Sequence, residues 1–144
     1  MSKFFIIDTN VVVAGLLTAR SDSPVAQILD GMLAAAFAFV VSEALLSEYR
    51  AVLLRPKLAR LHGLTADEVD SLLTDIARHA IVLVPSSGPS GGPIAPDLGD
   101  QLLWNLLATR DDLVLVTGDK LLLEDPVMLQ RIIPPQALIT RFTH

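Results

Sequence analysis

The chain alternates between short apolar runs and longer amphipathic segments. The short runs predict strands at residues 3–7, 37–41, 81–84, 113–117 and 131–133. Segments with apolar residues every three or four positions predict helices at residues 9–17, 21–36, 42–56, 65–80, 99–110 and 119–125. Strands that alternate with helices in this way predict an α/β fold: a three-layer α/β/α sandwich around a mostly parallel central sheet.

Capping residues mark the starts of several predicted helices. Ser23 and Ser42 stand where a side-chain oxygen can accept a hydrogen bond from the first helical turn. Thr65 is followed three positions later by Glu68, which is the pattern of a capping box. Pro56 is expected to end the helix that begins at Ser42. These signals support the helical assignments independently of the apolar period.

The composition predicts one globular domain that spans residues 1–144. The chain is 51% hydrophobic and 19% charged, which is enough apolar material for a core. It contains no cysteine, so disulfides, zinc–thiolate sites and thiol nucleophiles are excluded. The longest nearly uncharged stretch is too short to span a bilayer, so we expect a cytoplasmic protein without a membrane segment.

Charge argues against a protein that coats nucleic acid by charge alone. The chain has 11 basic and 16 acidic residues, a net charge of −5, whereas such proteins are usually strongly basic. Four basic residues nevertheless fall within eleven positions: Arg50, Arg55, Lys57 and Arg60. Such a group is either a solvated helix face or a positive lip that contacts an RNA backbone.

Two of the predicted strands lead directly to an aspartate. The run FFII is followed by Asp8, and LVLVTG is followed by Asp119. Ligands of parallel α/β sheets gather at the carboxyl ends of the strands. If these two strands are parallel neighbours, both carboxylates emerge at the same edge of the sheet.

Further acids are candidates for the same site. Asp97 and Asp100 stand at the entrance to the helix QLLWNLLA, and Glu48 lies close to the apolar stripe of the helix that starts at Ser42. Carboxylates brought together repel one another, and a cation would relieve that repulsion. All-oxygen ligands suit Mg²⁺ or Mn²⁺ rather than zinc. These metals assist phosphodiester hydrolysis by activating water and stabilising charge on the phosphate.

Four blocks of the sequence resemble the PIN-domain ribonucleases, and within them the VapC-like toxin components of toxin–antitoxin systems. They read IIDTNVVVAGLL, VVSEALLSEYRAVLLRPK, APDLGDQLLWNLLA and LVLVTGDKLLL. The resemblance implies a metal-dependent endoribonuclease with RNA as its substrate. It implies Asp8, Glu48 and Asp119 as metal ligands, with Asn10 close by and Thr117 assisting.

The third block departs from the commoner pattern of the family, which carries a denser run of aspartates. Ala95, Leu98 and Gly99 interrupt the run here and leave Asp97 and Asp100. Asp100 stands at the fitting distance before LLWNLLA and is the preferred ligand, with Asp97 as the substitute. A toxin of this kind would be covered by a small antitoxin protein, and the mean hydropathy of +0.52 also fits a homodimer.

Other interpretations remain open at this stage. A PIN-fold module that binds RNA or protein through a degraded, non-catalytic site would fit the thinned third block. A phosphatase of the haloacid-dehalogenase type fits less well, because it requires a second acid where this chain has Asn10. Trp104 could stack on a base, but its leucine neighbours predict a core position. His62, His79 and His144 show no metal-binding spacing.

Overall fold

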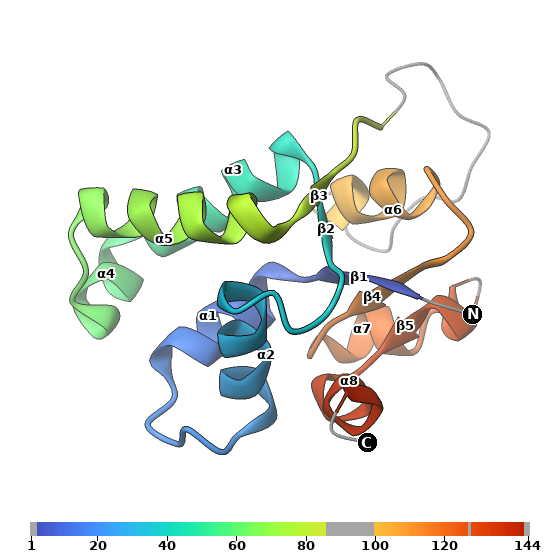
Figure 1. Cartoon of the computed structure of the whole chain (residues 1–144), viewed down its shortest axis with the longest axis horizontal. Helices are drawn as coiled ribbons and strands as arrows, with labels where there is room; N and C mark the ends of the chain where they lie inside the picture. The colour runs from blue at the N-terminus through green and yellow to red at the C-terminus, as the bar shows by residue number, and fades with distance from the viewer. Residues whose placement is uncertain (1–2, 86–99, 127, 143–144) are drawn as a thin grey trace.

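Short parallel strands occupy the middle of the molecule, with helices around them (Figure 1). The structure is a computed structural model that describes residues 3–85, 100–126 and 128–142. Within these ranges the strands are β1 (Phe4–Ile7), β2 (Val40–Val41), β3 (Ile81–Val82), β4 (Leu113–Val116) and β5 (Ile132–Ile133). The strands pair in parallel as β1–β4, β4–β5 and β2–β3. A bridge between Phe5 and Phe39 joins the two sheets in the order β3-β2-β1-β4-β5.

The helices connect these strands in an α/β arrangement. They are α1 (Thr9–Leu17), α2 (Pro24–Leu33), α3 (Glu43–Leu53), α4 (Pro56–His62), α5 (Ala66–His79), α6 (Gln101–Leu107), α7 (Lys120–Leu123) and α8 (Pro135–Phe142), with a 3₁₀ turn, η2, at Leu129–Arg131. The predicted fold class is confirmed: the protein is a three-layer α/β/α structure with parallel strands. No helix of the described ranges is long and apolar enough to cross a membrane.

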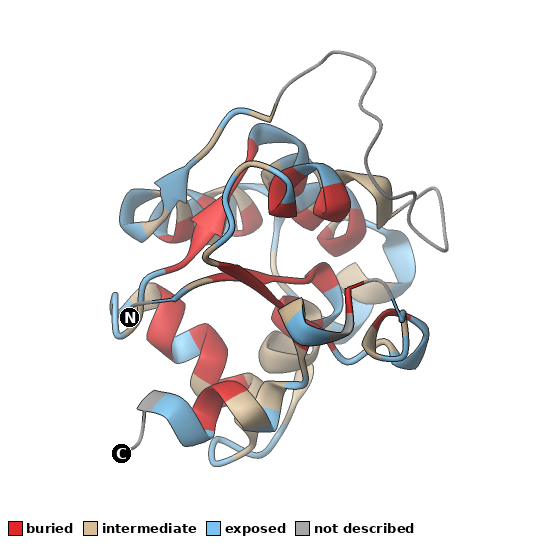
Figure 2. Ribbon diagram, turned by 90° about the vertical axis from the view of Figure 1, so that its right-hand side faces the viewer, coloured by how far each residue is buried: buried red, intermediate tan, exposed pale blue. Residues whose placement is uncertain are grey.

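The two central strands are apolar on both faces because layers of helices cover them. Ile6 and Ile7 of β1 and Leu115 and Val116 of β4 are completely buried. Such continuous apolar runs are typical of parallel strands with both faces covered. Figure 2 shows the buried residues concentrated on β1, β2 and β4 and on parts of the surrounding helices, whereas β3 is exposed. The register that pairs Ile7 with Val116 brings the carboxyl ends of β1 and β4 level with each other.

The predicted helix starts form as the capping chemistry requires. Ser42 Oγ accepts a hydrogen bond of 3.1 Å from the backbone N–H of Leu45 at the start of α3. Thr65 and Glu68 form both halves of the capping box of α5. Pro56, however, does not merely end a helix: α3 ends at Leu53, and Pro56 is the first residue of α4. Helices α4 and α8 were not predicted, since their prolines suit a first helical turn as well as a stop.

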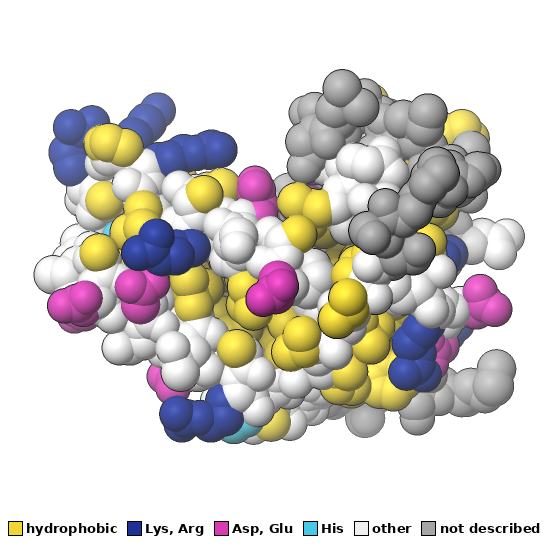
Figure 3. All heavy atoms as spheres, turned by 90° about the horizontal axis from the view of Figure 1, so that it is seen from above, with side chains coloured by type: hydrophobic (Ala, Val, Ile, Leu, Met, Phe, Trp, Pro, Cys, Tyr) yellow, Lys and Arg dark blue, Asp and Glu magenta, His cyan; other side chains and the backbone are white. Residues whose placement is uncertain are grey.

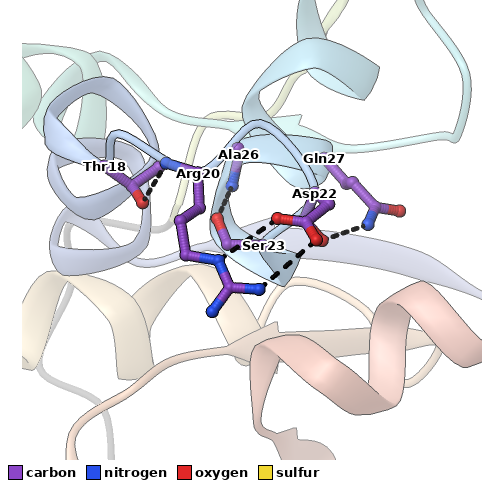
Figure 4. Close-up of polar contacts among 6 residues, drawn as sticks. All are labelled: Thr18, Arg20, Asp22, Ser23, Ala26 and Gln27. Carbon is purple, nitrogen blue, oxygen red and sulfur yellow. Dashed lines mark hydrogen bonds and ion pairs between the residues drawn. The ribbon is translucent and has the colours of Figure 1, made fainter.

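Local polar contacts hold the connection between α1 and α2 (Figure 4). The Arg20 guanidinium donates to both carboxylate oxygens of Asp22 at 3.4 Å, and Gln27 Nε2 donates to the backbone oxygen of Asp22 at 2.8 Å. Ser23 Oγ accepts from the Ala26 N–H and caps α2. The turn is therefore tied to the first residues of α2, against which α1 packs.

Candidate active site

Asp8 lies where β1 ends and α1 begins, and its side chain is almost completely buried, with 6% exposure. Thr117 Oγ1 donates a hydrogen bond of 2.7 Å to Asp8 Oδ2, and Asn10 Nδ2 donates to the same oxygen at 3.3 Å. Burial raises the pKa of Asp8 and the Thr117 hydrogen bond lowers it; the nearby charges of Asp119 and Glu48 raise it further. The net pKa is raised, so an additional positive charge would favour the ionised carboxylate.

Thr117 joins the ends of β1 and β4. Its hydroxyl is fully buried, accepts a hydrogen bond of 3.0 Å from the backbone N–H of Asp119, and donates to Asp8. Asn10 completes the link, because its Oδ1 accepts from the Gly118 N–H at 3.2 Å while its Nδ2 lies 3.3 Å from Thr117 Oγ1. The residues after two strands more than a hundred positions apart thus share one hydrogen-bonded network.

The other acids reach the site from three different helices. Asp119 is the N-cap of α7, and its Oδ1 accepts a hydrogen bond of 2.9 Å from the Leu121 N–H. Asp100 occupies the N-cap position of α6 without a side-chain capping bond. Glu48 lies in the middle of α3 and is partly exposed. Part of the capping role expected of such acids is therefore real for Asp119, whereas Asp8 makes no side-chain capping bond to α1.

Tyr49 is a positioning residue that the sequence analysis missed. It is fully buried beside Glu48, and its hydroxyl donates a hydrogen bond to the backbone oxygen of Ile7, the last residue of β1. Burial raises the pKa of Tyr49, and the charge of Asp8 adds to that shift, so the hydroxyl keeps its proton. The contact ties α3 to the residue that precedes Asp8. A lone tyrosine on the apolar stripe of the Glu48 helix was the available signal.

A cleft of about 480 Å³ opens at this end of the sheet. Four of the predicted acids line it: Asp8, Glu48, Asp100 and Asp119. The rest of the lining comes from α1 and from the end of α3 and the start of α4, namely Thr9, Asn10, Val13, Ala14, Leu17, Val52 and Arg55. A smaller hollow also touches Asp8, Glu48 and Asp100. Asp97, the substitute ligand, lies outside the described residues. The structure thus brings together the acids of all four sequence blocks in one cleft.

The acids do not form a closed metal cage as they stand. In the described ranges, no group of three or more His, Asp or Glu side chains is arranged to hold a metal ion. The chemistry of the donor set nevertheless fits Mg²⁺ or Mn²⁺, since the four carboxylates offer only hard oxygen ligands. The raised pKa of Asp8 points the same way, because its two acidic neighbours and its burial all oppose its ionisation.

The basic residues predicted to contact RNA separate into two places. Arg55 lines the cleft, and Lys57 follows it as an exposed residue of α4. Arg50 instead pairs with Asp70 of α5 at 2.7 Å and lines a different groove, between α3 and α5. Lysine and arginine side chains gather at the end of the molecule where α4 lies (Figures 1 and 3). Arg55 and Lys57 therefore stay candidates, whereas Arg50 lies outside the cleft.

The surroundings of Glu48, Trp104 and His62 show which contacts these three side chains make. Glu48 forms no salt bridge with Arg55, Lys57 or any other described residue. Trp104 is 2% exposed and belongs to the core, as its leucine neighbours predicted. The His62 ring contacts the Leu53 carbonyl oxygen and the Leu64 N–H, so it bridges the ends of α3 and α4.

The neighbouring parallel strands β1 and β4 thus lead to aspartates that line one cleft together with Glu48 and Asp100. The family model described as "PIN domain" matches residues 5–121, which include all of β1 except Phe4, the strands β2 to β4 and the four acids of the cleft. The chain therefore belongs to the PIN domain family. PIN domains are generally nucleases, enzymes that hydrolyse phosphodiester bonds. No curated protein matches the chain.

Proposed function

We propose that this PIN domain is an endoribonuclease that depends on Mg²⁺ or Mn²⁺ and cleaves RNA by hydrolysis. The observation that carries the proposal is the cleft at the ends of β1 and β4, lined by Asp8, Glu48, Asp100 and Asp119. These acids come from four segments spread over most of the chain, and ordinary capping needs would not bring them together. Asp8 is the strongest of them, because a nearly buried carboxylate with two acidic neighbours requires a positive charge to ionise readily.

The four carboxylates would hold the cation, with water as the nucleophile. When bound, the cation would supply positive charge for the phosphate and lower the pKa of water. Thr117 and Asn10 have a supporting role, since both donate a hydrogen bond to Asp8 Oδ2 and so fix the orientation of the carboxylate. Asp97 stays the substitute for Asp100 in the third sequence block.

The basic residues near the cleft would contact the RNA backbone. Arg55 is in the cleft itself and Lys57 follows on α4, so both can reach a strand that enters there. Arg50 would contribute least, because its guanidinium is engaged by Asp70. Phosphate contacts of this kind position RNA and carry little sequence information.

The resemblance to VapC-like proteins extends the proposal to biological role. In that role the chain would be a cytoplasmic, single-domain toxin, and a small antitoxin protein would bind over the cleft. A homodimer is a further partner that the apolar composition favours. The chain can be purified alone and after co-expression with the proteins encoded beside it. Measurement of its mass in solution then tests both partners directly.

The catalytic proposal is tested by cleavage of a structured RNA. Wild type with Mn²⁺ should cut, whereas wild type with EDTA and Asp8→Ala with Mn²⁺ should not. A thermal unfolding series in the same buffers gives a second readout, because a ligand that binds only the folded state raises its stability. Mn²⁺ should raise the Tm of wild type and not that of Asp8→Asn.

Two glutamates of α3 provide a matched control. Glu48 lines the cleft, while Glu43 is exposed in the first turn of the same helix. Glu48→Gln should abolish the Mn²⁺ response and cleavage, and Glu43→Gln should retain both. Equal cleavage in every lane, including EDTA, would identify a contaminating nuclease and defeat the proposal.

The second candidate function is a binding module with the PIN fold and a degraded site. It is favoured by the lack of a preassembled metal-holding group among the described residues. In that case RNA would bind without cleavage, and Mn²⁺ would not change the Tm. The haloacid-dehalogenase alternative is disfavoured, since Asn10 stands where the second acid of that chemistry would be and is already bonded to Asp8 and Gly118.

A further inference from the structure

The cleft has an apolar part that the proposed chemistry does not use. Val13, Ala14 and Leu17 of α1 and Val52 of α3 line it; we call these four residues the apolar wall. Positions 13 and 17 are four residues apart and so lie on one face of α1. The three α1 residues are partly exposed, whereas Val52 is 9% exposed. Apolar surface is therefore accessible directly beside the acids.

Arg55 adds a positive charge to the same cleft. It is the N-cap residue of α4, is exposed, and is the one basic residue of the described part of the chain that lines the cleft. It forms no salt bridge with another described residue. A single cleft thus combines carboxylates, an apolar wall and a guanidinium that forms no salt bridge with another described residue.

We propose that the apolar wall is a nucleotide subsite: it takes the base of an unpaired RNA nucleotide next to the phosphate to be cleaved, and Arg55 holds a flanking phosphate. This inference rests on the proposed function for the position of the cleaved phosphate. A cleft of about 480 Å³ is the size of a small-ligand pocket. The guanidinium complements an anion, and the neighbouring wall complements the flat apolar face of a base.

The composition of the wall also sets what kind of RNA fits. Bases in a duplex are stacked on their neighbours, so a base reaches the wall only from a single-stranded or looped region. The four side chains of the wall carry no hydrogen-bonding group, so they contact the face of any base and do not read its edge. The subsite therefore separates unpaired from paired RNA more strongly than one base from another.

Binding measured without catalysis tests the subsite. Fluorescence anisotropy of a labelled six-nucleotide RNA in EDTA should give a Kd at least tenfold lower for the single strand than for the same strand in a duplex. Leu17→Asn should weaken single-strand binding about fivefold to tenfold, because apolar surface that would be buried against the base is lost. Leu61→Asn is the control, since Leu61 is 63% exposed on α4 and does not line the cleft. Should Leu17→Asn fail to fold, Val13→Thr tests the wall with a side chain of the same shape.

The arginine is tested through salt dependence. Arg55→Gln should weaken all single strands about equally and reduce the slope of log Kd against log salt by about 1, as expected for one lost phosphate contact. Arg60→Gln on the same helix is the control, because Arg60 does not line the cleft. A larger effect of Arg60→Gln than of Arg55→Gln would overturn the assignment of Arg55.

The outcomes separate this inference from the proposed function. Binding that depends on Leu17 and Arg55, with or without cleavage by wild type, supports the subsite. Cleavage that depends on Mn²⁺ and Asp8, with binding unaffected by both variants, would overturn the subsite and leave the nuclease. A change of mass in solution on Leu17→Asn, without a change in RNA affinity, would assign the wall to a contact between copies of the chain and also overturn the subsite.

Discussion

The two sides of the acidic cleft are built differently. The strand-end group consists of Asp8, Asn10, Thr117 and Asp119, and hydrogen bonds join its members through Thr117 and Asn10. The helix group consists of Glu48, Asp100 and Arg55, which reach the cleft from α3, α6 and the start of α4. One side is fixed by the register of β1 and β4, whereas the other depends on how helices pack.

This difference explains why the acids share a cleft without forming a metal cage in the described ranges. The strand-end group is held in place before any cation arrives. Glu48 is a long side chain in the middle of α3, and it would have to adjust to complete the coordination shell of the proposed cation. We infer that stability is concentrated in the strand-end group and that cation binding depends on both.

The largest expected effect is the loss of the Thr117 hydroxyl. Thr117→Val keeps the shape but removes the donor to Asp8 and the acceptor for the Asp119 N–H, all at a fully buried position. We expect the free energy of unfolding in EDTA to fall by about 2 kcal/mol, because buried polar groups lose their partners. Glu48→Gln should change it by less than about 0.5 kcal/mol.

Urea unfolding in EDTA measures both variants. Thr74→Val is the control for the chemistry of the substitution, since the Thr74 hydroxyl donates to the Asp70 backbone oxygen on an exposed helix face. It should cost little. Equal losses for Thr117→Val and Glu48→Gln would contradict the division of the cleft into a fixed and an adjustable side.

The next effect is the pH dependence that Asp8 contributes. Burial raises the pKa of Asp8 in the folded state above its ordinary value of 3.8. As the pH falls from above that raised pKa towards 3.8, the folded protein takes up a proton that the unfolded chain does not hold. The free energy of unfolding therefore increases as the pH falls through this window, by at most about 1.4 kcal/mol per pH unit. Above the window, the buried ionised carboxylate of Asp8 destabilises the folded protein to its full extent.

Comparison with Asp8→Asn isolates this contribution, because the asparagine does not titrate. The difference in free energy of unfolding between wild type and Asp8→Asn, measured in EDTA, should move in favour of wild type as the pH is lowered through the window. Asp111→Asn, at an exposed turn position, is the control for the substitution itself. A difference that stays constant with pH would show that burial does not raise the pKa of Asp8.

The sequence predicted the strand-end group better than the helix group, for a physical reason. Asp8 and Asp119 follow short apolar runs, and parallel pairing of those runs is enough to bring the two acids together. Pro56 could not be interpreted in the same way, since a proline fits both the end of one helix and the first turn of the next. Helix α4, and with it the position of Arg55, therefore depends on packing that the local sequence does not specify.

Two contacts between residues far apart in the sequence explain other differences between the predicted site and the structure. Arg50 pairs with Asp70, twenty positions away, only because α3 packs against α5. The Tyr49 hydroxyl reaches the Ile7 carbonyl oxygen, which is 42 positions away in the sequence. Neither contact has a spacing signal, so the basic group near Glu48 looked continuous in the sequence although the structure divides it between two grooves.

A smaller effect is expected where Tyr49 connects the two sides. Tyr49→Phe removes the hydrogen bond to Ile7 and leaves the ring in the core, so the free energy of unfolding should fall by about 1 kcal/mol. Because Tyr49 adjoins Glu48, the rise in Tm produced by Mn²⁺ should also become smaller. An unchanged Tm and an unchanged Mn²⁺ response would mean that apolar packing alone positions α3.

The smallest effect is expected at the solvent-facing edge of the strand-end group. Asn10 is exposed, and its bonds to Asp8 and Thr117 are both 3.3 Å long, so water can replace them in part. Asn10→Ala should lower the free energy of unfolding by only about 0.5 kcal/mol. It should still weaken the Mn²⁺ response, because Asp8 then keeps a single side-chain donor, Thr117. If Asn10→Ala lowered the free energy of unfolding as much as Thr117→Val, this prediction would be wrong. The exposed bond from Asn10 to Asp8 would then contribute as much to stability as the buried bond from Thr117.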